Sequence, residues 1–72
     1  MRELRLNREL YDAPSIDTAL QVFARFAQFE RKEEPAHWLI RITAKSEARE
    51  RHIYWELANY TLGLTVKGQM AS

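Results

Sequence analysis

The spacing of apolar residues alternates between two periods along the 72-residue chain, and this order limits the folds it can adopt. In residues 2–10, leucines alternate with polar side chains, as in a strand with one buried face. From residue 13 to residue 27, apolar residues lie three and four apart, as on one side of a helix. Residues 37–44 return to the strand period, and the chain from residue 46 returns to the helical one. The order predicts helices packed on a small sheet.

Asp12 and Pro14 mark the start of the first predicted helix. The Asp12 carboxylate can accept a hydrogen bond from a free amide of the first turn, and Pro14 has no amide to leave unpaired there. Ser15 is the alternative N-cap. The helix is expected over about residues 13–27, and its apolar side consists of Ile16, Ala19, Leu20, Phe23, Phe26 and Ala27.

The charged segment 30–34 is interpreted as a solvated connection, because Pro35 disfavours helical geometry at the residue before it. Whether residues 27–31 form a short strand stays open, since their alternation is weak. The strand predicted over residues 37–44 has an apolar face and a largely polar one, on which Leu39 is the exception. The apolar face consists of Trp38, Ile40, Ile42 and Ala44. The sheet is therefore expected to be covered on one side only.

Ser46 is the predicted N-cap of the second helix, with Glu47 favourably placed in its first turn. This helix is expected to end near residue 63. In the alternative, residues 60–66 form a strand, because apolar residues alternate there. Residues 67–72 are expected to fray.

These elements together predict an α+β fold. It is a small two-layer sandwich in the order strand, helix, short strand, strand, helix, with both helices on one face of the sheet. Residues 1–72 form one domain with an ordered core over about residues 2–66. A domain of this size buries only about 60% of the surface of its unfolded chain, and the absence of cysteine excludes disulfides. Self-association is one remaining way to stabilise it.

The second helix has apolar residues on two nearly opposite sides, given a turn of about 100° per residue. One side carries Ile53, Leu57, Tyr60 and Leu64. The other side carries Ala48, Trp55, Leu62 and Val66. Either the first helix covers one side and the sheet the other, or the second side is an interface for a second copy or another partner. Trp and Tyr are typical of the centres of such interfaces.

Composition argues against several classes of protein. Eleven basic and ten acidic residues give a net charge of +1, which leaves little field to attract nucleic acid. No run approaches the roughly 18 apolar residues of a membrane span, and the N-terminus lacks the apolar core of a signal peptide. The expected location is therefore cytoplasmic.

No constellation of residues points to catalysis, a cofactor or a metal. His52 and Glu56 are four residues apart on a helix, which supplies two metal ligands and no visible third. His37 is interpreted as a turn or edge residue. Gly63 and Gly68 cannot form a phosphate-binding loop. The sequence thus predicts a non-catalytic protein-interaction module and not an enzyme.

The chain resembles the HxsD-type proteins of His-Xaa-Ser peptide-maturation systems over roughly residues 4–66. The residues that carry the resemblance are Tyr11, Ile16 and Ala19 at the first helix, Ile40-Arg41-Ile42 in the strand, and Glu56, Leu57 and Asn59 in the second helix. The resemblance implies a small accessory protein encoded with radical-SAM enzymes that modify a His-Xaa-Ser repeat peptide. It assigns no catalytic residues to this chain.

Two interaction modes follow from this interpretation. In the first, the module binds a peptide or a partner enzyme; an extended peptide could bind along a sheet edge, which the strand at residues 2–10 or the strand at residues 37–44 is expected to offer. Alternatively, the domain is a self-assembling adaptor, a homodimer with no ligand of its own.

Overall fold

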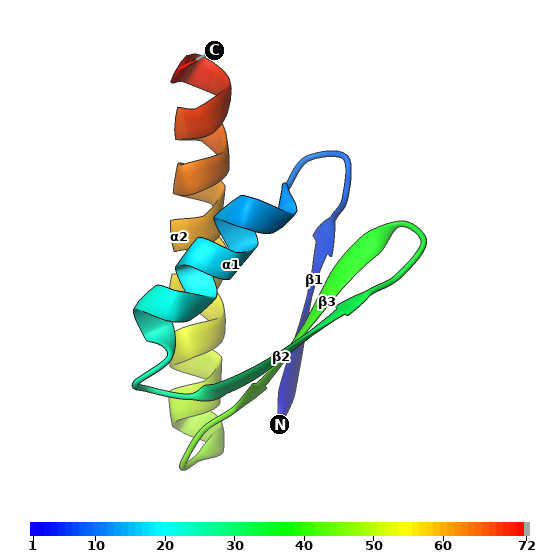
Figure 1. The fold of residues 1–72 in the computed structure, drawn as a ribbon. Coiled ribbons are helices and arrows are strands. Elements are labelled where there is room, and N and C mark those ends of the chain that lie inside the picture. The colour runs from blue at the N-terminus through cyan, green and yellow to red at the C-terminus, as the bar shows by residue number, and fades with distance from the viewer. Residues whose placement is uncertain (72) are drawn as a thin grey trace.

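The computed structural model describes the backbone of residues 1–71 and the side chains of residues 1–66. The elements follow in the order β1 (Arg2–Asn7), α1 (Ala13–Phe23), β2 (Gln28–Glu33), β3 (His37–Thr43) and α2 (Glu47–Ala71). Both helices lie on the same side of the sheet (Figure 1). The predicted α+β fold, with strands and helices in the predicted order, is confirmed.

The three strands form one antiparallel sheet in the order β1-β3-β2. β3 is therefore the central strand, and β1 and β2 are both edges. The charged segment 30–34 belongs mostly to β2, so its interpretation as a solvated connection was wrong. Charged residues suit an edge strand, because they oppose pairing with other chains. The turn itself lies between Glu33 and His37.

Asp12 caps α1, with its Oδ1 accepting a hydrogen bond of 2.7 Å from the amide of Ser15. The helix ends at Phe23, four residues earlier than expected. Turns occupy residues 24–26, where the amide of Phe26 donates to the carbonyl of Phe23 at 2.9 Å. An earlier end is required because the chain must reverse in time for Gln28 to pair with Thr43.

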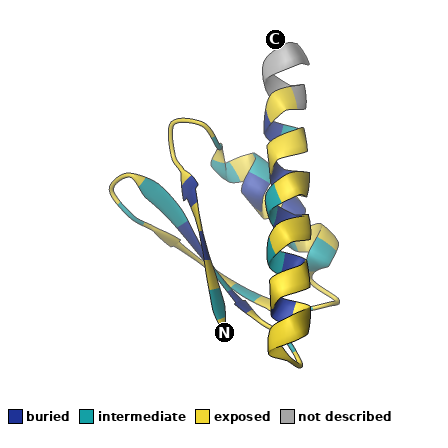
Figure 2. Ribbon diagram, turned by 180° about the vertical axis from the view of Figure 1, so that it is seen from behind, coloured by how far each residue is buried: buried dark blue, intermediate teal, exposed yellow. Residues whose placement is uncertain are grey.

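The core lies between the sheet and the two helices (Figure 2). Its buried residues are Leu4, Leu6, Ile16, Ala19, Ile40, Ile42, Ile53 and Leu57. On the opposite face of the sheet only Leu39 is buried, at 4% exposure. Its register partners are Arg5 and Lys32, and long charged side chains of this kind can cover apolar surface with their stems. One covered face, with Leu39 as the exception, agrees with the prediction.

α2 continues to Ala71, well beyond the expected end near residue 63, and residues 60–66 are helical and not a strand. The reason is that Thr61 and Thr65 are buried on the core side, one helical turn apart and in line with Leu57. Thr61 Oγ1 donates to the carbonyl of Leu57 at 2.8 Å. The backbone of residues 67–71 belongs to α2, whereas residue 72 and the side chains of residues 67–72 lie outside the described part of the chain. The expected fraying of residues 67–72 stays a prediction.

Candidate protein-interaction surface

The core side of α2 largely follows the predicted apolar stripe. Ile53 and Leu57 are buried and Leu64 is half-buried, whereas Tyr60 is exposed at the border of the stripe. The Tyr60 ring meets Phe23 of α1 edge to face, with 5.8 Å between the ring centroids. The flank of α2 that carries Tyr60 therefore faces α1.

The opposite side of α2 is left uncovered by the described residues. Trp55 is 60% exposed, Leu62 47% and Val66 43%, and Ala48 is exposed as well. The interpretation in which α1 covers one side and the sheet the other is therefore wrong. Both α1 and the sheet pack on the same half of α2 (Figure 2). Whether a partner covers the other half stays a prediction.

The flank of α2 that turns away from α1 is rich in apolar and aromatic side chains. Tyr54 and Trp55 stack edge to face, with 5.2 Å between their ring centroids. The guanidinium carbon of Arg2, in β1, lies 5.8 Å from the centre of the Tyr54 ring. We call this surface the β1-side flank, consisting of Tyr54, Trp55, Ala58 and Leu62. It lies next to the open edge of the sheet.

The open edge of β1 carries unpaired main-chain groups at defined positions. The amide of Arg8 donates to the carbonyl of Ala36 at 3.1 Å. Because ladder bonds alternate along an antiparallel pair, the even residues of β1 bond to β3. The main-chain amides and carbonyls of the odd residues Glu3 and Arg5 therefore point away from β3, toward the open edge of the sheet. The expectation that β3 offers a free edge was wrong, because β3 is paired on both sides.

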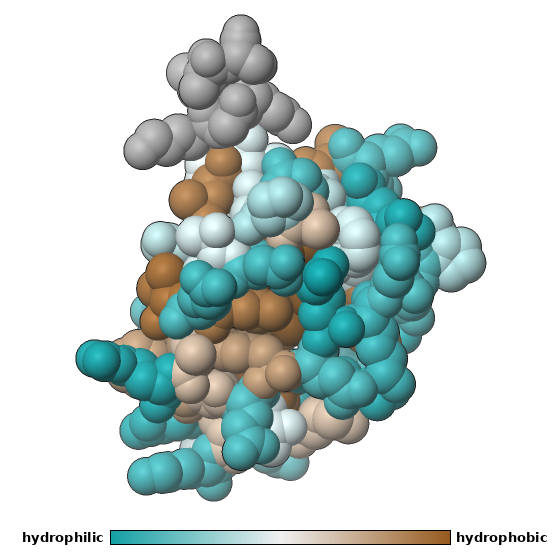
Figure 3. Space-filling model, viewed as in Figure 1, coloured by the Kyte–Doolittle hydropathy of each residue, from teal (hydrophilic) through white to brown (hydrophobic). Residues whose placement is uncertain are grey.

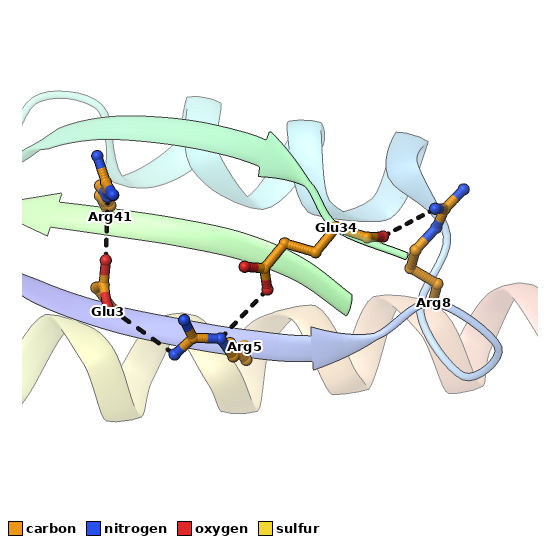
Figure 4. A network of polar contacts seen from close by, with 5 residues as sticks. All are labelled: Glu3, Arg5, Arg8, Glu34 and Arg41. Carbon is orange, nitrogen blue, oxygen red and sulfur yellow. Dashed lines mark hydrogen bonds and ion pairs between the residues drawn. The ribbon is translucent and has the colours of Figure 1, made fainter. Parts of the chain in front are cut away.

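Charged side chains cover the face of the sheet away from the helices (Figure 4). Arg41 Nε donates to Glu3 Oε2 at 3.0 Å, and Arg5 Nε donates to Glu34 Oε1 at 3.2 Å. Arg5 Nη1 also lies 3.9 Å from Glu3 Oε1. At the end of the sheet, Arg8 Nη1 donates to the main-chain carbonyl of Glu34 at 2.9 Å. Positive and negative groups are therefore paired across this face.

Two arginines enclose Trp38 on the helix side of the sheet. The guanidinium carbons of Arg8 and Arg31 lie 4.8 Å and 5.1 Å from the ring centre. Trp38 Nε1 donates to the carbonyl of Tyr11 at 3.0 Å, and Arg31 pairs with Asp17 of α1 at 3.0 Å. The arrangement ties β2, β3 and the loop before α1 together, and each charge already has a partner.

Glu50 is a buried carboxylate that the sequence analysis did not single out, with 5% exposure. Its Oε2 accepts a hydrogen bond from the amide of Ala44 at 3.0 Å, and its Oε1 lies 3.0 Å from the N-terminal ammonium of Met1. The Ala44 hydrogen bond, followed by that of the ammonium, lowers the pKa of Glu50 below its usual value. Its position in the first turn of a predicted helix was the only signal in the sequence.

A groove of about 470 Å³ lies between the end of α1 and the start of α2. Phe23, Phe26 and Ile53 line it, and its rim includes His52 and Glu56, whose Nε2 and Oε1 atoms are 3.1 Å apart. Apolar side chains gather over the helices, whereas hydrophilic ones dominate the sheet side of the same view (Figure 3). Among residues with described side chains, no three His, Asp or Glu gather as metal ligands would.

No helix in the described part of the chain is long and apolar enough to span a membrane. Comparison of the chain with protein families, with curated proteins and with solved structures finds no match.

Proposed function

We propose that this chain is a non-catalytic protein-interaction module that assembles with a second copy through the outer side of α2. The observation that carries the proposal is the exposure of Trp55, at 60%, beside the exposed Leu62 and Val66. Burial of apolar surface is worth about 25 cal/mol per Å². A large aromatic side chain on this side of α2 is therefore a strong source of binding free energy.

Two further properties support a second copy as the partner. The net charge of +1 creates little repulsion between copies. The core is thin, with eight buried apolar residues in its cluster among the residues whose side chains are described. A domain this small gains stability when a second copy covers additional apolar surface.

The resemblance to HxsD-type proteins gives the proposal a setting, namely an accessory role beside enzymes that modify a His-Xaa-Ser repeat peptide. A second candidate function within that setting is binding of the extended peptide along β1. The open main-chain groups of Glu3 and Arg5 favour it, since peptides commonly add as a strand to a free sheet edge.

The two tryptophans provide a test with an internal control. A variant that keeps only Trp55, made by Trp38→Phe, is followed by fluorescence from nanomolar to high micromolar concentration. We expect a blue shift of the Trp55 emission as the copies associate. The matched Trp55→Phe variant should show no shift from Trp38, whose indole already bonds to Tyr11. A Trp55 spectrum that does not change over this range contradicts self-assembly through α2.

The peptide candidate is tested separately by NMR titration with a His-Xaa-Ser peptide. Shifts at the amides of Glu3 and Arg5 would support strand addition at β1, and their absence at millimolar peptide would contradict it.

A further inference from the structure

The main-chain groups at the edge of β1 form a set that a second β1 can satisfy. Glu3 and Arg5 direct their amides and carbonyls away from β3, as the alternation from the Arg8 bond requires. Asn7, next in this series, already accepts from the amides of Leu10 and Tyr11 at 3.2 Å and 3.0 Å. Glu3 and Arg5 each offer one amide and one carbonyl. In an antiparallel pair of copies, these groups can form four hydrogen bonds with those of Arg5 and Glu3 of the other copy.

The charges of Glu3 and Arg5 select one register for such a pair. With the twofold axis at Leu4, Glu3 of each copy lies directly opposite Arg5 of the other. Sliding one strand by two residues against the other, in either direction, puts the axis at Glu3 or at Arg5 and sets two like charges opposite one another, which is destabilising. The side chains and the main-chain groups therefore favour the same axis.

The position of α2 along β1 places the β1-side flank at the same axis. α2 runs in the same direction as β1 (Figure 1), and Arg2 stacks on Tyr54. A strand advances about 3.3 Å per residue and a helix about 1.5 Å. Leu4, two residues after Arg2, is therefore level with Ala58, about four residues after Tyr54. The small side chain of Ala58 allows close approach of two helices, with Trp55 and Leu62 on either side of it.

The lateral spacing also fits a helix pair. α2 packs against both β1 and β3, so its axis lies near the gap between these strands. Adjacent strands are about 4.8 Å apart. Two copies joined at β1 would then hold their α2 axes about 10 Å apart, within the usual range for packed helices.

We propose that two copies pair antiparallel through β1, with the twofold axis at Leu4, and form one continuous six-stranded sheet. On one face of this sheet the two α2 helices pack antiparallel around Ala58 and cover Trp55 and Leu62. Ala48 and Val66 lie farther round the helix, at the rim. This geometry rests on the proposed self-association. It specifies that the copies meet through β1 as well as α2, and that the strands pair in the register with the axis at Leu4.

The other sheet edge is a poor alternative for the same role. β2 carries charged residues at four consecutive positions, from Glu30 to Glu33, so both of its faces are polar. Charges on both faces of an edge strand oppose strand pairing.

A charge exchange tests the register. In the Glu3→Arg variant, a basic side chain lies opposite Arg5 of the other copy, and in the Arg5→Glu variant an acidic one lies opposite Glu3. We expect each variant alone to associate at least tenfold more weakly than the original chain. An equimolar mixture restores opposite charges at every position, so it should form a heterodimer. Exchanges at the other edge, Glu30→Arg and Lys32→Glu, are the matched controls and should leave association unchanged.

Far-UV circular dichroism and thermal melting establish that each variant folds. A cross-link provides a second measurement that does not alter the charges. The chain has no cysteine, so Ala58→Cys supplies a single thiol on the β1-side flank and Glu56→Cys a single thiol on the α1 side. A short bifunctional maleimide should join two copies of the first variant and not of the second.

The outcomes separate this inference from the function on which it rests. Weak association of each variant, a dimer in the mixture and a cross-link at Ala58→Cys support the β1 register. Dimers of undiminished affinity in both single variants, or a mixture that stays monomeric, overturn the register while self-assembly stands. A monomer of the original chain at every concentration overturns both.

Discussion

The rings of Tyr54 and Trp55 meet edge to face, with 5.2 Å between their centroids, yet Trp55 remains 60% exposed. Its neighbour positions the indole without covering it. A large aromatic side chain held in this way loses little conformational freedom on binding. It is therefore the residue of α2 on which association should depend most.

Replacement of Trp55 by Glu is expected to weaken association strongly while leaving the fold intact. Loss of a central interface tryptophan costs about 2 kcal/mol or more, which is roughly a 30-fold rise in the dissociation constant. The stability of the monomer should fall by no more than about 1 kcal/mol, since only the contact with Tyr54 is lost. Sedimentation velocity and urea unfolding measure the two effects. Val22→Glu, at an exposed apolar residue of α1, is the control and should not change association.

Glu50 makes stability depend on pH in a defined direction. Its pKa in the folded state is lowered, first by the hydrogen bond from Ala44, so its contribution is present above the unfolded pKa. That contribution is lost as the pH falls through the folded pKa. The Glu50→Gln variant should be less stable at pH 7 and should lose less stability on acidification. Urea midpoints between pH 7 and pH 3 test this.

Glu47→Gln removes a charge from the same helical turn without touching Ala44 and is the control for Glu50. An equal pH dependence in the Glu50→Gln variant and the original chain would contradict the role of Glu50. Asp12 contributes in the same direction, because its hydrogen bonds with Ser15 lower its pKa. Some acid sensitivity should therefore remain in the Glu50→Gln variant.

The helix cap of α1 gives a prediction about stability alone. Asp12→Ala removes the acceptor for the Ser15 amide, and loss of such a cap costs about 1 kcal/mol. Asp12→Asn keeps an acceptor at the same position, so most of the stability should return. Thermal melting of the two variants checks the difference. Equal melting temperatures would show that the cap does not hold α1.

Two buried threonines of α2 should respond oppositely to the same substitution. Thr65 Oγ1 is buried without a hydrogen-bond partner among the described residues, so Thr65→Val is expected to stabilise the fold by about 1 kcal/mol. Thr61 donates to Leu57, so Thr61→Val should destabilise it by about 0.5 kcal/mol. Chemical denaturation measures both, and destabilisation by Thr65→Val would contradict the first expectation.

The type and order of the helices and strands, and the exposed side of α2, could be predicted from the sequence. The order of the strands in the sheet could not. Alternation in residues 37–44 shows which side chains share a face, and it does not show which strand lies beside which. For this reason β3 was expected as a possible edge and is in fact central. The opposite directions of Ile53 and Trp55 follow from helical geometry alone, and their burial and exposure agree with it.

Misassigned boundaries have a common physical cause in tertiary context. The threonines at 61 and 65 have low helix propensity, yet both are buried against the core and keep α2 helical. The charged residues of β2 form a strand because β3 supplies hydrogen bonds along one side. Local propensity could not reveal either effect, and it gave no sign that Glu50 would be buried beside the N-terminus.

Sedimentation equilibrium of the original chain, from nanomolar to high micromolar concentration, is the decisive test of its self-assembly. Self-assembly through α2 predicts a mass that rises from 8.5 kDa to twice that value. It also predicts that the Trp55→Glu variant stays at the lower mass over most of the same range. A mass of one chain at every concentration would contradict self-assembly through α2.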